Sequence, residues 1–124
     1  MAIDIKPVEA LDLWRAATLE GVRRDAPDLS ARQMAIILAV YLTPPPHTVR
    51  GLAKTINVSK PVITRALDKL GRMELLRRKV DETDRRSILI QRTVKGSVFL
   101  REFGEIISEA AAGLDDAETL ARKS

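Results

Sequence analysis

The 124-residue sequence predicts a mainly α-helical fold that carries one small β-hairpin, an α+β arrangement. Three observations lead to this prediction. Apolar residues recur at three- and four-residue intervals in several stretches, as they do on one face of an α-helix. Residues 48–70 contain two short helical patterns around a turn signal, and residues 75–92 contain two strand-like runs around an acidic turn. The length is that of a single domain, residues 1–124, with one modest core.

The composition excludes several classes of protein. With no cysteine and a single histidine, His47, the chain has no disulfide, thiolate metal site or cysteine redox sensor. It has no Ser-His-Asp set or glycine-rich phosphate loop, so we expect no enzyme, cofactor or metal site, and we interpret His47 as a partly exposed loop residue. No apolar run could span a membrane and the N-terminal residues do not form a signal peptide, which predicts a cytoplasmic protein with no membrane partner.

The charge is divided unevenly along the chain. Residues 49–101 hold 14 Lys and Arg against 5 Asp and Glu, a balance of +9, whereas the rest holds 7 against 12, a balance of −5. This asymmetry favours a central unit that binds a polyanion, flanked by segments with another role.

The first helix is expected from about Pro7 to Arg24, with proline acceptable in its first turn. Its stripe at helical spacing consists of Val8, Leu11, Trp14, Thr18 and Val22. Such a stripe needs a surface to pack on, either the body of this chain or a partner subunit.

The second helix is expected over residues 31–42. Ser30 and Gln33 have the spacing of a capping box at its start, and Thr43 with the prolines 44–46 ends it. The helix has little polar face, which predicts a buried central position.

The stretch from Thr48 to Leu70 has the pattern of a helix-turn-helix. Thr48 is the expected N-cap of a helix whose small Ala53 permits close packing, and Asn57 tolerates the left-handed turn that follows. Ser59 is the expected cap of the second helix, residues 59–70, with Pro61 in its first turn.

The outward residues of this second helix suit a DNA groove. An arginine such as Arg65 can donate two hydrogen bonds to guanine, Thr64 can contact a thymine methyl or a phosphate, and Lys60 can neutralise phosphate. The alternative is a surface-exposed helical hairpin of some other small domain.

The hairpin is expected from strands 75–80 and 87–92 around an acidic turn. A hairpin after a helix-turn-helix forms a winged helix, and Arg85 and Arg86 at its edge could enter a minor groove. The alternative is an ordinary solvated turn.

The last helix begins after Thr93, its expected N-cap, and its apolar stripe runs to about Ala112. Gly113 and the pair Asp115-Asp116 predict a break before a short helix over residues 117–123. The terminal stripes either form an interface or cover the winged-helix core.

The order of these motifs resembles the MarR family of winged-helix transcription regulators over most of the chain. That family runs Leu-Thr-x-x-Gln, Leu-Ala, Lys-x-x-Val-Thr-Arg, Asp-x-Arg and Thr-x-x-Gly. The corresponding residues here are Leu29-Ser30 to Gln33, Leu52-Ala53, Lys60 to Arg65 with Ile63 for valine, Asp84-Arg85-Arg86, and Thr93 to Gly96. The chain departs from the pattern at Glu74, where the family usually has glycine, and at Arg92, where it has leucine. The first departure puts the exit of the helix in question, with Gly71 as an alternative loosening point.

The resemblance implies a sequence-specific regulator of transcription, more often a repressor, that binds a palindrome as a homodimer. It places residues 29–93 in a DNA-binding lobe and residues 5–25 and 94–122 in helical dimerisation arms, with helix 59–70 in the major groove and wing 81–86 in the minor groove. Asp84 would hold the wing arginine in place.

The implied DNA-contacting residues are Ser59, Lys60, Pro61, Thr64, Arg65, Lys69, Arg85 and Arg86, and the implied dimer residues are Leu11, Trp14, Phe99, Phe103, Ile106 and Ile107. The resemblance also allows a small-molecule effector, which no residue pattern identifies. The competing hypothesis is a winged-helix module whose basic face binds an acidic protein.

Overall fold

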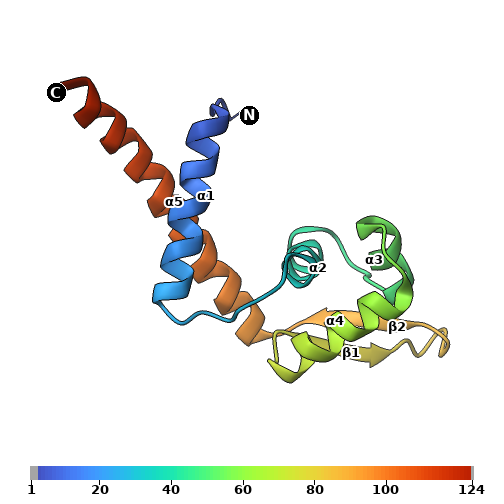
Figure 1. The fold of residues 1–124 in the computed structure, drawn as a ribbon. Helices are drawn as coiled ribbons and strands as arrows, with labels where there is room; N and C mark the ends of the chain where they lie inside the picture. The colour runs from blue at the N-terminus through green and yellow to red at the C-terminus, as the bar shows by residue number, and fades with distance from the viewer. Residues whose placement is uncertain (1–2, 124) are drawn as a thin grey trace. The chain divides into compact units, whose positions relative to one another are not determined.

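The computed structural model describes the backbone of residues 3–123 and the side chains of residues 3–114. The elements follow in the order α1 (Pro7–Arg23), α2 (Ala31–Leu42), α3 (Val49–Ile56), α4 (Lys60–Arg72), β1 (Leu76–Val80), β2 (Ile88–Arg92) and α5 (Val94–Lys123) (Figure 1). The two strands form one antiparallel sheet, so the predicted fold class, mainly helical with a small hairpin, is confirmed. In the described part of the chain, no helix has both the length and the apolar character needed to cross a membrane.

The chain divides into two compact units. We call Leu29–Leu100 the lobe, and the segments up to Asp28 and from Arg101 onward the arms. The lobe therefore extends seven residues beyond the expected boundary at residue 93 and includes the first turns of α5.

The core of the lobe is aliphatic except for one phenylalanine. Its buried residues are Ile36, Ile37, Val40, Leu52, Ala53, Ile63, Ala66, Leu67, Leu70, Leu75, Leu76, Ile90 and Phe99. Helix α2 supplies three of these residues, but its Ala35 and Leu42 are exposed. The helix is thus buried on one face only, which corrects the prediction of a buried central helix. Apolar composition alone does not determine how many neighbouring elements cover a helix.

Local signals set the ends of α2 and α3 as predicted. The Ser30 Oγ accepts a hydrogen bond from the Gln33 backbone N–H at 3.2 Å, and the Gln33 Oε1 accepts one from the Ser30 N–H at 2.8 Å. The Thr48 Oγ1 accepts the Gly51 N–H at 3.0 Å. Asn57 adopts φ 62° and ψ 50°, the left-handed conformation expected at the turn between α3 and α4.

The cap of α4 differs from the prediction. Ser59 occupies the N-cap position, but its side chain makes no capping hydrogen bond. Pro61 lacks an N–H, so the Val62 N–H is the donor left for a capping side chain. That N–H bonds instead to the carbonyl oxygen of Ser59, at 3.1 Å.

The exit of α4 lies at Glu74 and not at Gly71. The helix continues through Gly71 to Arg72, and Glu74 adopts φ 61°. The Leu75 N–H donates to the Leu70 carbonyl at 3.0 Å and the Glu74 N–H to the Gly71 carbonyl at 3.0 Å, which together form a Schellman motif. Glu74 therefore occupies the left-handed position that suits glycine. The alternative that the helix loosens at Gly71 is wrong.

We expect Glu74→Gly to stabilise the lobe by about 0.5 to 1 kcal/mol, because glycine adopts positive φ without the steric cost that a Cβ carries. The substitution also removes an ion pair between the Glu74 Oε2 and the Lys95 Nζ at 3.8 Å, but both side chains are mostly exposed and such pairs contribute little. Urea unfolding with unchanged m-value measures the effect. Glu74→Ala, which keeps the Cβ, is the matched control and should give no gain.

Each strand of the hairpin begins one residue later than predicted, because Leu75 completes the end of α4 and Ser87 belongs to the turn. Leu76 pairs with Arg92 and Val80 with Ile88. The connector before α3 adds a third short stretch to the sheet: Thr48 forms an isolated bridge with Leu89, and the His47 carbonyl accepts the Ile90 N–H at 2.8 Å. His47 is a half-buried connector residue, as predicted.

Arg92 has a structural role that explains its departure from leucine. Its Nε donates to the Val40 carbonyl at 2.9 Å and its Nη2 to the Thr43 carbonyl at 3.2 Å. These carbonyls lie at the C-terminal end of α2, where backbone acceptors have no helical partner and a cation is favoured. Arg92 therefore caps α2.

Helix α5 is continuous from Val94 to Lys123, so the break predicted at Gly113 is wrong. Glycine costs about 1 kcal/mol in a helix but keeps its backbone donor, unlike proline, and does not by itself end a helix. At the start of α5, the Thr93 Oγ1 accepts the Gly96 N–H at 2.9 Å, as predicted for an N-cap.

In the arms, α1 and α5 lie side by side (Figure 1). Trp14 and Phe103 meet edge to face with ring centroids 6.3 Å apart, and Arg24 bonds Glu20 at 2.8 Å and approaches Glu109 at 3.6 Å. Helix α1 ends at Arg23, one residue before the expected end.

Candidate nucleic-acid interface

Helix α4 presents two different faces. Ile63, Ala66, Leu67 and Leu70 are buried in the lobe, which leaves the intervening positions outside. Its exposed residues include Lys60, Pro61, Thr64, Arg65 and Lys69. The sequence placed these residues outward together with Asp68, which is half-buried. A 3.6-residue period fixes which side chains share a face.

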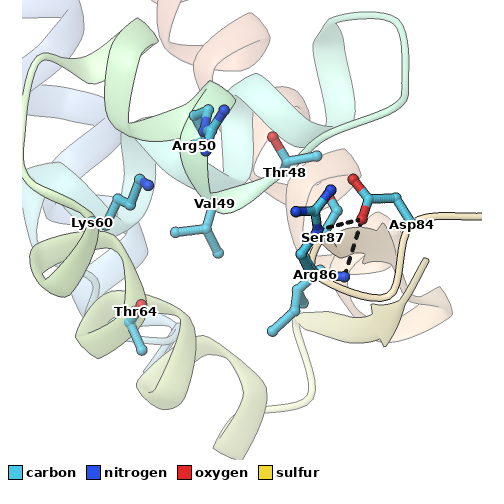
Figure 2. A pocket seen from close by; sticks show the side chains of 9 residues that line it. Thr48, Val49, Arg50, Lys60, Thr64, Asp84, Arg86 and Ser87 are labelled. Carbon is cyan, nitrogen blue, oxygen red and sulfur yellow. Dashed lines mark hydrogen bonds and ion pairs between the residues drawn. The ribbon is translucent and has the colours of Figure 1, made fainter.

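A concavity of about 650 Å³ lies where α4, the start of α3 and the wing meet (Figure 2). Helix α4 contributes Lys60 and Thr64, and α3 with its cap contributes Thr48, Val49 and Arg50. The wing contributes Asp84, Arg86, Ser87 and Ile88. Three cations and one carboxylate thus line one hollow, which gives it a net positive charge.

Asp84 fixes the backbone and side chain of the wing arginine. Its Oδ1 accepts the Arg86 backbone N–H at 3.2 Å and the Arg86 Nε at 3.5 Å (Figure 2). The Arg86 side chain is 95% exposed, so this pairing is weak and leaves the guanidinium available to another anion.

The turn of the wing is held by Asp81. The Thr83 hydroxyl donates to the Asp81 Oδ1 at 2.7 Å and the Thr83 N–H at 2.9 Å. The hydrogen bond from the Thr83 hydroxyl has the largest effect, and together with the N–H it lowers the pKa of the Asp81 carboxyl below its usual value. The carboxylate is therefore ionised at neutral pH, and its support of the turn is lost only as the pH falls through that lowered pKa.

An ion pair joins α4 to the wing. The Arg78 Nη2 on β1 donates to the Asp68 Oδ1 on α4 at 2.7 Å, with both side chains partly exposed. Asp68 follows Thr64 by four residues and therefore lies near it on the helix surface. Arg78 thus neutralises the carboxylate on the outer side of α4.

The structure brings only part of the expected DNA-contacting set into the concavity. Lys60, Thr64 and Arg86 line it, whereas the remaining members are exposed on α4, at its cap or on the wing: Ser59, Pro61, Arg65, Lys69 and Arg85. Sequence reasoning missed Thr48, Arg50 and Ser87. Arg50 carried a weak signal, since it lies outside the apolar face of its helix and one turn before Lys54.

The expected dimer residues fall into two groups. Phe99 belongs to the core of the lobe and Ile106 is buried within the chain. Leu11 and Trp14 are 70% and 55% exposed, and Phe103 and Ile107 are half-buried. The stripe on α1 therefore keeps apolar surface that the described part of the chain leaves exposed.

Three helices followed by an antiparallel hairpin, with α3 and α4 joined by the left-handed Asn57 turn, define the lobe as a winged helix-turn-helix. The family model described as MarR family matches residues 28–87. This match confirms, over these residues, the resemblance to the MarR family that the sequence shows.

Solved structures share the fold. The S. aureus MepR-DNA complex is 21% identical with a TM-score of 0.71, over 92% of this chain and 90% of that one. YusO from Bacillus subtilis is 17% identical with a TM-score of 0.63, over 90% and 72% of the two chains. The transcriptional regulator Tm0710 from Thermotoga maritima is 20% identical with a TM-score of 0.63, over 92% and 72%.

Proposed function

We propose that this chain is a sequence-specific, double-stranded DNA-binding regulator of transcription, acting as a dimeric repressor on a palindromic operator. The observation that carries the proposal is the cationic concavity between α4 and the wing, lined by Arg50, Lys60 and Arg86. The match of residues 28–87 to the MarR family model and the fold shared with the MepR-DNA complex support it.

In the proposed complex, α4 lies in the major groove with Thr64 and Arg65 toward base edges, and the wing places Arg86 at the minor groove. Ser59, Lys60, Pro61 and Lys69 lie along the sugar-phosphate backbone beside it, with Arg85 at the wing. Asp84 acts indirectly, by holding Arg86.

The dimer is proposed to form through the arms. Leu11 and Trp14 on α1 expose apolar surface that a second copy would cover, and the half-buried Phe103 and Ile107 adjoin the same helix pair. Two recognition helices related by a two-fold axis would lie one DNA turn apart, roughly 34 to 36 Å. Sedimentation equilibrium of the wild type and Trp14→Ala tests this step, with a shift toward monomer expected for the variant.

Selection of bound duplexes from random DNA tests the function as a whole. We expect enrichment of a palindrome whose half-sites are about one helical turn apart. Equal retention of every duplex would contradict sequence-specific binding, and capture of an acidic protein without any DNA shift at low salt would favour the interaction module instead.

The Asp68–Arg78 pair gives a charge-based prediction. We expect Arg78→Gln to weaken DNA binding about five-fold, because the unpaired carboxylate on α4 then repels nearby phosphates by roughly 1 kcal/mol. Adding Asp68→Asn should restore most of the loss, as measured by fluorescence anisotropy. No restoration in the double variant would mean that Arg78 acts on DNA directly.

A further inference from the structure

Arg50 and Lys60 are cations without an internal counter-charge. Among the described residues, neither side chain makes a hydrogen bond or an ion pair, although both line the concavity. Asp84 is the one acid among the described residues that line the same hollow, and it already bonds Arg86. Two uncompensated positive charges on facing elements therefore remain for an external anion.

Hydroxyl groups complete the chemistry of the hollow. Thr48 accepts the Gly51 N–H through its Oγ1 and still has its own hydroxyl proton to donate. Thr64 and Ser87 line the same concavity. Two cations together with hydroxyl donors suit a tetrahedral oxyanion with several acceptor oxygens, such as phosphate.

The backbone under Arg50 is held firmly. Thr48 caps α3, pairs with Leu89 of β2 in an isolated bridge, and precedes Arg50 by only two residues. The backbone of Arg50 therefore lies at a fixed point of the lobe, and its side chain lines the concavity between α4 and the wing (Figure 2). It stands on α3, the first helix of the helix-turn-helix, which in this motif crosses the DNA backbone, whereas the second helix contacts bases.

We propose that the concavity is the binding site for one backbone phosphodiester of DNA, held by Arg50 together with Lys60. This inference rests on the proposed function and adds to it a phosphate site centred on α3. Arg50 fixes the position of the duplex and does not discriminate between bases.

The proposal has a distinct signature in solution. Arg50→Ala should weaken binding to all duplexes by a similar factor, about ten-fold at moderate salt, and should lower the slope of log K against log salt by about 0.9. The rank order of operator variants should not change. Arg50→Lys keeps the charge and should recover most of the slope.

The decisive experiment uses duplexes in which one phosphate at a time is replaced by an uncharged methylphosphonate. At the position held by Arg50, the replacement should weaken the wild type strongly and Arg50→Ala much less, because only Lys60 still contacts that phosphate in the variant. At other contacted positions it should weaken both proteins equally. Lys54→Ala, on the same helix but outside the concavity, is the matched control and should behave as the wild type at every position.

The possible outcomes separate this inference from the function on which it rests. A wild type that binds no duplex overturns both. A wild type that binds, with Arg50→Ala equally sensitive to every methylphosphonate or altered in base preference, overturns the phosphate site alone. Calorimetry with inorganic pyrophosphate distinguishes DNA from a free anion as the source of the phosphate. If Arg50→Ala abolished pyrophosphate binding but left the affinity for DNA unchanged, the hollow would be a site for a free anion, and the proposal would be overturned. Unchanged thermal melting of Arg50→Ala confirms that the fold is intact.

Discussion

Gly96→Ala is expected to lower the free energy of unfolding by about 3 kcal/mol, the largest stability effect that we anticipate from one methyl group. A Cβ at position 96 would overlap the hydroxyl of Tyr41 and the carbonyl oxygen of Leu75. One neighbour is the backbone of Leu75 and the other is the packed ring of Tyr41, so neither can move aside as a flexible side chain would.

The cost includes lost hydrogen bonds as well as steric overlap. The Tyr41 Oη donates to the Leu75 carbonyl at 2.7 Å and accepts the Thr93 N–H at 2.9 Å. It thereby joins α2, the exit of α4 and the start of α5. Displacing the ring by a methyl group breaks both bonds, at about 1 kcal/mol each.

Chemical denaturation of the wild type, Gly96→Ala, Gly71→Ala, Tyr41→Phe and the double variant Tyr41→Phe/Gly96→Ala measures this effect. Gly71→Ala is the matched control, since a Cβ there meets nothing within 4 Å, and it should stabilise the helix by up to about 1 kcal/mol. Tyr41→Phe removes the overlapping hydroxyl, so Gly96→Ala should cost less in that background. A Gly96→Ala protein as stable as the wild type would show that the close packing at Tyr41 is not needed.

Features coded by neighbouring residues were predicted correctly. The capping box of Ser30 and Gln33, the cap at Thr48 and the left-handed Asn57 each depend on residues within a few positions of one another. The same local reasoning failed at Ser59, where the first-turn proline and the backbone carbonyl decide the outcome, and at Gly113, where the helix continues through the glycine. Propensity describes a residue's average behaviour, and its neighbours decide the individual case.

Features that join distant segments could not be predicted. Glu74 adopts positive φ where the chain turns to bring Leu75 into the core, a requirement that no composition rule contains. Arg92 contacts α2, some fifty residues earlier in the chain, through carbonyl oxygens that carry no sequence signal. Arg50 joins the candidate site only because the connector pairs with β2 and brings α3 beside the wing.

Arg65→Ala is expected to cost about 1 to 3 kcal/mol in binding to the selected operator and to relax the preference at one base pair of each half-site. Arg65 is exposed on α4, and the nearby acid, Asp68, already bonds Arg78 at 2.7 Å. The guanidinium is therefore not engaged by the carboxylate three residues away, and it can donate two hydrogen bonds to one guanine.

Lys60→Ala provides the contrasting result, because Lys60 is proposed to neutralise a phosphate and not to contact a base. Its removal should weaken binding to all duplexes alike and lower the salt slope by about 1. Arg23→Ala removes the same charge from the arms, a different unit of the chain, and serves as the control for net charge. Titration of operator variants at several salt concentrations separates the two behaviours. If Arg65→Ala weakened all sequences equally, as Lys60→Ala should, Arg65 would contact only the DNA backbone, and the source of sequence preference would have to lie in Thr64, in the wing or in the shape of the duplex.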